Sequence, residues 1–236
     1  MERKLTIIAG VGSLLMLLLV ILSYQVFSTK KVEVLEVLVA KETIYPRTKI
    51  TEYNTKVVKV PKIYITGNAL TDKKMVLGHY TNVYSVIPEG SLFYQEILEK
   101  PENLSDYPGL LLLKGQVSYA LMSDVAKSAG NSLVAGQKVD LYASISQKEQ
   151  AQVTDCLIKG IRITAIKDRN GVDITKEESS GIPYVILLAV NESYVKYLKA
   201  ADKLGNIELY AVNANYGDMT ESQLNENSLV LPYLLA

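Results

Sequence analysis

The chain has 236 residues, in which 25 Lys and Arg balance 25 Asp and Glu, and its length allows one or two domains. A formal net charge of zero gives no basic surface for phosphates, so nucleic acid is not an expected partner. One Cys and one His exclude an intrachain disulfide, a cysteine-rich zinc site and a histidine metal cluster.

The strongest signal is an uncharged N-terminal segment, Leu5–Thr29, in which Leu14–Leu22 is apolar without interruption. About 23 residues at ~1.5 Å each give roughly 34 Å, enough to cross ~30 Å of hydrocarbon. A cleaved signal peptide would have a shorter apolar region and would end at a small-x-small site. We therefore expect an uncleaved single-pass transmembrane anchor. We also expect a short cytoplasmic tail and the bulk of the chain outside the cytoplasmic membrane.

Residues 32–99 read as short β-rich runs broken by Pro and Gly turns, including Val32–Val39 and Lys56–Val60. Two further stretches, Ile44–Ile50 and Ile87–Phe93, each place a turn between apolar residues six positions apart. Each stretch predicts a strand that turns and re-enters the hydrophobic core.

The polar, turn-rich segment 100–108 is the best candidate linker. Before it lie the short cytoplasmic tail with the anchor, 1–31, and a first domain, 32–99. After it lie a second domain, 109–215, and a C-terminal tail, 216–236. Alternating apolar positions in the second domain predict strands, of which the clearest are 115–122, 138–144 and 154–167.

A strand, helix and strand follow in a βαβ-like passage. Residues 184–190 form the apolar first strand, Asn191 is a plausible N-cap and Gly205 is the expected stop before a strand at 206–212. One face of the helix is apolar and should lie on a sheet, since it carries Val195, Leu198, Ala201 and Leu204. The predicted fold class is mainly β with some α, an α+β protein.

Residues that carry chemistry are few. His79 is the only possible histidine base, and no nucleophile elbow, phosphate-binding loop, dinucleotide fingerprint or EF-hand occurs. Cys156 lies in an apolar strand, where cysteine usually behaves as a small buried hydrophobe. We expect no catalytic residue, no cofactor and no metal, and so no enzymatic activity.

Four carboxylates gather around one turn and could bind a divalent cation or act in pairs, although a solvated acidic loop is the favoured interpretation. They are Asp168, Asp173, Glu177 and Glu178. The tyrosines expected at the surface could line a carbohydrate or protein groove, although ordinary sheet-surface positions are favoured. They include Tyr45, Tyr53, Tyr64, Tyr80, Tyr84 and Tyr94.

The chain ends in an apolar tail that docks either on its own domain, which is the default, or on a partner. The candidate partner contacts are Leu229, Leu231, Tyr233 and Leu234. Deleting residues 228–236 is expected to leave folding intact and to weaken partner recovery.

The order of these features resembles the CpaB/RcpC family of assembly proteins for tight-adherence (Flp) pili, over nearly the whole chain. Residues similar to a SAF domain are Val39–Ile44, Ile50–Thr51, Val57–Pro61, Gly67–Asp72, Leu77–Gly78 and Ile87–Gly90. Residues similar to the second family domain are Lys114–Leu121 and Leu133–Leu141, followed by the strand, helix and strand at 184–212.

The chain departs from the family pattern at four turn positions. Tyr45 and Arg47 stand where the family usually has Pro and Gly, Ala135 replaces a turn Pro, and Gln137 replaces an Asp. Because Arg47 replaces a glycine, its φ is expected to be negative.

The resemblance implies a β-clip SAF-like domain and a second, RcpC-like mixed α/β domain, without catalytic residues. It also implies a membrane-anchored protein that assembles Flp pili through contacts with other envelope components. The alternatives are a cell-wall or glycan-binding SAF module and a flagellar-chaperone-like assembly factor. Oligomeric state has no readable signature in the sequence.

Overall fold

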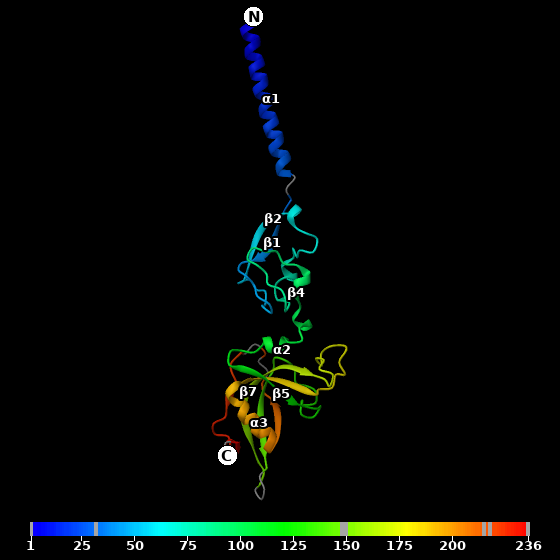
Figure 1. Cartoon of the computed structure of the whole chain (residues 1–236), viewed down its shortest axis with the longest axis vertical. Helices are drawn as coiled ribbons and strands as arrows, with labels where there is room; N and C mark the ends of the chain where they lie inside the picture. Colours follow the sequence, from blue (N-terminus) through cyan, green and yellow to red (C-terminus); the bar gives the residue numbers. More distant parts are fainter. Residues whose placement is uncertain (1, 31–32, 147–150, 214–215, 217–218, 235–236) are drawn as a thin grey trace. The chain divides into compact units, whose positions relative to one another are not determined.

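The computed structural model describes the chain except for residues 1, 31–32, 147–150, 214–215, 217–218 and 235–236 (Figure 1). The described chain divides into two compact units, residues 1–104 and 105–236, and each unit has its own hydrophobic core. The division falls within the segment that the sequence marks as a linker. The fold is mixed α/β with more strand than helix, which confirms the predicted class.

The first helix, α1, spans Glu2–Lys30, and its side chains are described from Gly10 to Val26. Every described side chain of α1 is exposed, and those from Leu14 to Leu22 expose between 49% and 71% of their surface. Among the residues that the structure describes, none of the helices is both long enough and apolar enough to cross a membrane.

The rest of the first unit is built from short elements. They are β1 (Val34–Ala40), β2 (Thr55–Pro61), η1 (Lys62–Tyr64), η2 (Lys73–Met75), β3 (Tyr80–Thr81), η3 (Gln95–Ile97), β4 (Leu98–Glu99) and η4 (Pro101–Asn103). β1 and β2 form an antiparallel ribbon in which Val34 lies opposite Pro61 and Ala40 lies opposite Thr55. Both ribbon strands were predicted, although Val32, the expected first residue, lies outside the described residues.

The two stretches with a turn between apolar residues each re-enter the core, as the sequence predicts, and they also meet there. Ile44 and Ile87 exchange two backbone hydrogen bonds, of 2.8 and 2.9 Å, so the stretches pair with each other as equivalent units. Ile50 and Phe93, the second apolar residue of each stretch, are fully buried in the same cluster. We call Ile44–Ile50 and Ile87–Phe93 the paired hooks.

The turns of the paired hooks share a left-handed residue, and this corrects the expectation for Arg47. Arg47 has φ +59° and the equivalent Gly90 has φ +80°. The first turn is held by buried Thr81, whose Oγ1 donates to the carbonyl of Tyr45 at 2.8 Å and accepts from the amide of Thr48 at 3.0 Å. Because these bonds fix the backbone on both sides, the turn keeps its shape without a glycine.

The second unit contains one antiparallel sheet with the strand order β5-β8-β7-β6-β9, and β10 pairs with β7 beside it. The strands are β5 (Gln116–Met122), β6 (Lys138–Ile145), β7 (Val153–Lys167), β8 (Val185–Asn191), β9 (Gly205–Ala211) and β10 (Gln223–Leu224). The helical elements are α2 (Tyr107–Leu110), η5 (Glu192–Tyr194), α3 (Val195–Leu204) and α4 (Leu231–Leu234). The predicted strands are confirmed, and their ends shift by at most one residue.

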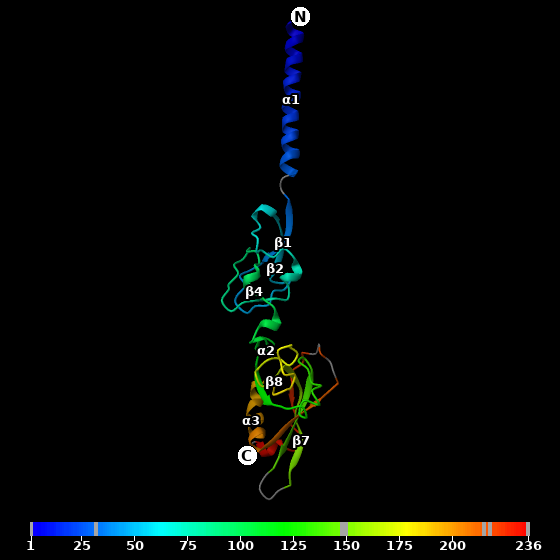
Figure 2. The ribbon, with the colours of Figure 1, turned by 90° about the vertical axis from the view of Figure 1, so that its right-hand side faces the viewer.

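The α3 helix packs on the sheet as predicted, and Figures 1 and 2 show it beside the strands. Leu198 and Ala201 are buried in the same core as the sheet residues, whereas Leu204 is 39% exposed. The side chain of Asn191 accepts from the amide of Ser193 at 3.0 Å, which confirms the N-cap.

The βαβ-like interpretation is wrong in its pairing. β8 pairs with β5 and β7, whereas β9 lies at the far edge against β6, and these strand pairs are all antiparallel. Gly205 does follow the helix, but with φ −173° it is extended rather than left-handed. Glycine is needed there because an added Cβ would lie 1.8 Å from the carbonyl oxygen of Ser144 in β6.

Candidate functional site

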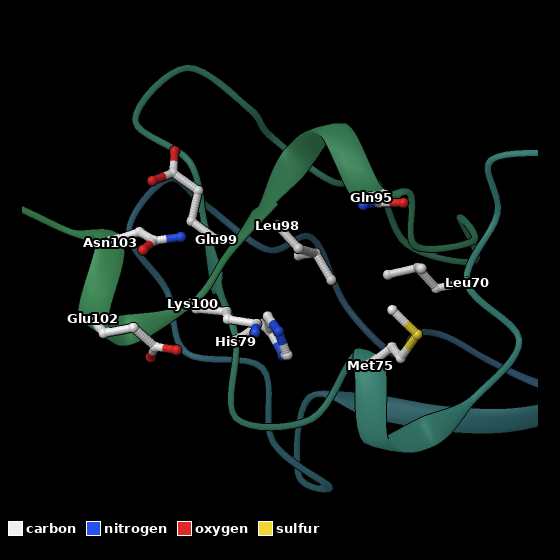
Figure 3. Close-up of a pocket in the computed structure, with 9 residues that line it drawn as sticks. All are labelled: Leu70, Met75, His79, Gln95, Leu98, Glu99, Lys100, Glu102 and Asn103. Carbon is white, nitrogen blue, oxygen red and sulfur yellow. The ribbon is translucent and has the colours of Figure 1, made fainter. Parts of the chain in front are cut away.

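The first unit contains a pocket of about 350 Å³ beside β4 (Figure 3). Nine residues from η2 to η4 and the neighbouring loops line it, and only Leu70, Met75 and Leu98 among them are apolar. The rim carries amide and charged side chains, including Glu99 and Lys100. Pockets that bind small molecules are mostly lined by apolar and aromatic groups, so this pocket lacks their usual character.

His79 faces this pocket, so the structure places the only histidine in a concave site (Figure 3). Its backbone carbonyl accepts from the amide of Ile50 at 2.8 Å, which fixes the residue beside the first hook. The ring Nδ1 atom is buried and has no hydrogen-bond partner among the described residues. A histidine base in a catalytic pair is normally oriented by a hydrogen bond to such a partner.

The exposed tyrosines do not gather at this pocket, because none of its nine lining residues is a tyrosine. Tyr45, Tyr53, Tyr64 and Tyr84 are exposed, as the sequence predicts, with exposed fractions from 66% to 90%. The expectation is wrong for Tyr80, which is 6% exposed. It lies in β3, where both residues are buried. Tyr94 is half-buried and pairs with Ala69.

Two exposed apolar groups stand out on the first unit. The loop before the second hook exposes Tyr84 at 90%, with Val83 and Val86 about half exposed. The η1 turn exposes Ile63 at 87% and Tyr64 at 73%. Sequence reasoning missed Ile63, which lies two residues after the proline that ends β2. Exposed apolar groups of this size are typical of contact surfaces.

The acidic turn is not a solvated loop at Asp168, which corrects the favoured interpretation. Asp168 is buried, and its Oδ1 atom accepts from the amides of Asn170 and Val172 at 2.9 and 3.0 Å. Its Oδ2 atom accepts from the amide of Ser180 and the hydroxyl of Ser179, both at 3.0 Å. The bond from Ser180, with these other donors, lowers the pKa of Asp168 below its ordinary value.

The other acidic residues do not join Asp168 in a site. Asp173 accepts from the amide and hydroxyl of Thr175 at 3.0 and 2.7 Å, a local turn, and Glu177 and Glu178 are exposed. Within the described part of the chain, no group of three or more His, Cys, Asp or Glu side chains is arranged to hold a metal ion.

Cys156 is a free, buried thiol, as the sequence predicts. Burial, followed by the negative charge of Asp140, raises the pKa of the Cys156 thiol above its ordinary value. A raised thiol pKa keeps the side chain protonated and slow to react at neutral pH.

Two cations lie opposite each other in the second unit, and sequence reasoning missed them. Lys138 in β6 is the register partner of Arg162 in β7, and each is 8% exposed. Arg162 donates from Nη2 to the carbonyl of Leu111 at 2.6 Å, and Lys138 donates from Nζ to the carbonyl of Thr220 at 3.2 Å. Burial lowers the pKa of the Arg162 guanidinium. Both cations therefore tie connecting segments to the sheet.

The C-terminal tail docks on its own unit, which confirms the default expectation. Val230 is fully buried in the core of the second unit, and Leu231, Tyr233 and Leu234 are half-buried against it. Of the four candidate partner contacts, only Leu229 is exposed, at 65%. The expectation that deleting 228–236 leaves folding intact is not supported, because the deletion removes Val230. Residues 235–236 lie outside the described residues.

No protein-family model, no curated protein and no solved structure matches the chain.

Proposed function

We propose that this chain is a non-enzymatic, membrane-anchored envelope protein that takes part in the assembly of Flp-type pili through protein contacts. The observation that carries the proposal is α1, a 29-residue helix with no charged residue from Leu5 to Thr29. Neither hydrophobic core includes a described α1 side chain. The apolar surface of α1 must therefore be buried by contacts outside these two cores.

A lipid bilayer can bury this apolar surface, and its thickness matches the length of the uncharged segment. At ~1.5 Å per residue, this segment is long enough to cross ~30 Å of hydrocarbon. The proposal takes the whole segment from Leu5 to Thr29, which extends beyond the side chains that the structure describes in α1. The short N-terminal tail then stays in the cytoplasm, and both β-rich units lie outside the cytoplasmic membrane.

The pilus role rests on the resemblance to the CpaB/RcpC family, and two structural observations support it. The paired hooks are consistent with a β-clip SAF-like domain, since Ile44 and Ile87 bond to each other as equivalent residues. The first unit also presents the exposed surface of Val83, Tyr84 and Val86, which suits contact with another protein of the envelope.

A glycan-binding role is the second candidate, and the pocket beside β4 is the observation that favours it. Gln95 and Asn103 place amide groups at the rim, where they can bond to sugar hydroxyls. Sedimentation of the full chain with purified peptidoglycan tests this role. Binding that is lost in Gln95→Ala and retained in Gln223→Ala, a change at an exposed glutamine of β10 that does not line the pocket, would favour the second candidate.

Gene deletion in the native host tests the proposed function directly. Surface filaments are counted by negative-stain electron microscopy after complementation with the full chain, with a chain lacking residues 5–29, or with Tyr84→Ser. We expect the full chain to restore filaments and the shortened chain to fail. Tyr84→Ser should reduce the count, whereas Tyr53→Ser, a change at an equally exposed tyrosine, should not. Unchanged filament numbers after gene deletion would contradict the proposal.

A further inference from the structure

The η1 turn presents apolar surface that the first unit does not use. Ile63 is 87% exposed and Tyr64 is 73% exposed, and no residue of η1 is buried. A single exposed apolar residue is ordinary on a protein surface, but two adjacent large ones on a tight turn form a small protruding contact.

Hydrogen bonds hold this turn beside the start of β1. The amide of Lys62 donates to the carbonyl of Glu33 at 2.8 Å, and Lys62 Nζ lies 3.1 Å from Oε2 of Glu33. The amide of Ile65 closes the turn by donating to the carbonyl of Lys62 at 3.1 Å. The position of η1 is therefore fixed relative to Glu33.

Glu33 is three residues beyond Lys30, where α1 ends. A chain extends by at most ~3.6 Å per residue, so three residues span at most about 11 Å. A hydrogen-bonded backbone neighbour adds roughly 5.5 Å. The chain and this hydrogen bond thus keep Lys62, the first residue of η1, within about 16 Å of the end of α1, and Ile63 and Tyr64 follow it directly.

We infer that η1 inserts Ile63 and Tyr64 into the headgroup region of the bilayer that holds α1, which makes this turn a second membrane contact. The inference rests on the proposed membrane anchor. Each headgroup layer is roughly 5–8 Å thick, so a turn tethered this closely to the anchor can reach it. Tyrosine is enriched at membrane interfaces because its ring is apolar and its hydroxyl is polar.

The charges around the turn fit the same surface. The sequence places Lys30 and Lys31 at the end of the uncharged segment, and Lys62, which is paired with Glu33, precedes the two apolar residues. Lysine side chains extend their apolar stems along an interface and keep the ammonium group among the headgroups. Anionic lipids would strengthen such a contact.

Tyr53 is a matched control at the other end of the ribbon. It is 90% exposed and lies two residues before β2, whereas η1 directly follows β2. Seven residues of strand separate the two positions by roughly 20 Å. If η1 contacts the bilayer, Tyr64 should lie in the headgroup region and Tyr53 should not.

The chain contains no Trp, so one introduced Trp reports a single position without background. The full chain carrying Tyr64→Trp or Tyr53→Trp is reconstituted into phosphatidylcholine and phosphatidylglycerol vesicles, with some acyl chains brominated near the headgroup. Flotation first establishes whether each variant is bound to the vesicles. Tryptophan emission is then compared with and without the brominated lipid.

We expect both variants to float with the vesicles. The emission of Tyr64→Trp should be shifted to the blue and quenched at least twofold more than that of Tyr53→Trp. Floating vesicles with equal quenching at the two positions would overturn the inference and leave the anchor intact, and η1 would then be free for a protein partner. Failure of both variants to float would overturn the anchor itself, together with the inference that depends on it.

Discussion

The two units of this chain bury apolar surface in different ways. Among the described residues, the core cluster of the second unit contains twenty buried apolar side chains around one antiparallel sheet, and its longest strand, β7, has 15 residues. The core cluster of the first unit contains eight, which lie on short strands and on the turns and loops between them. A small core without long strand pairs depends on each turn and each buried side chain, so the first unit should be the more sensitive to single changes.

The largest expected effect is at Phe93, the apolar end of the second hook. Phe93 is fully buried in the small core, and Phe93→Ala should lower the free energy of unfolding of the first unit by about 3–5 kcal/mol. Thermal unfolding followed by circular dichroism measures the change. Alkylation of Cys156, which is buried in the second unit, reports separately on that unit.

Phe93→Ala should lower the unfolding temperature of the first unit only, so Cys156 in the second unit should stay protected from alkylation through that transition. If Cys156 became reactive at the same reduced temperature, the two units would unfold together, and the comparison between them would fail.

The second effect compares neighbouring residues in the C-terminal tail. Val230→Ala removes two buried methyl groups and should cost about 2 kcal/mol, whereas Leu229→Ala changes an exposed side chain and should be near neutral. Urea unfolding of the full chain, read through Cys156 alkylation, measures both. Equal effects at the two positions would show that the tail does not dock as described.

The third effect tests the paired hooks. Gly90→Ala meets no atom within 4 Å but must adopt φ +80°, so it should cost about 1 kcal/mol. Arg47→Gly relieves the same kind of strain, and this gain offsets the entropy that glycine adds to the unfolded chain. We therefore expect Arg47→Gly to leave the melting temperature of the first unit unchanged or raised. A loss equal to that in Gly90→Ala would contradict equivalent turns.

The smallest effect at neutral pH concerns Asp168. Its folded pKa is lowered, so the ionised carboxylate stabilises the second unit above the unfolded pKa of about 3.9. This stability should be lost as the pH falls through the folded pKa. Melting temperatures between pH 7 and pH 2.5 should fall more steeply for the wild type than for Asp168→Asn, which is less stable at pH 7. Parallel curves of melting temperature against pH for the two proteins would exclude a stabilising role for the Asp168 charge.

Local patterns predicted most of the elements. Alternation of apolar residues predicted β6 and β7, and Asn191 predicted the start of the helical segment, because these signals depend on neighbours in the chain. The equal spacing from Ile44 to Ile50 and from Ile87 to Phe93 predicted the hooks. It did not predict that they bond to each other, since that pairing joins residues far apart in the sequence.

The wrong predictions were made from the type of a residue alone, without the contacts that other parts of the chain make with it. Arg47 adopts a left-handed turn because Thr81, 34 positions later, fixes the backbone around it. Asp168 is buried because four donors from its own loop surround its carboxylate. The pairing of β9 with β6 depends on the whole sheet, and the exposure of Ile63 depends on where the ribbon ends.

The most direct test of the membrane anchor is alkaline carbonate extraction of membranes from the native host, followed by protease treatment of spheroplasts or protoplasts. The full chain should stay with the membrane pellet after extraction, and externally added protease should digest both β-rich units. A chain lacking residues 5–29 should appear in the soluble fraction. Release of the full chain by carbonate, or protection of both units from external protease, would contradict a single-pass protein with its units outside the cytoplasmic membrane.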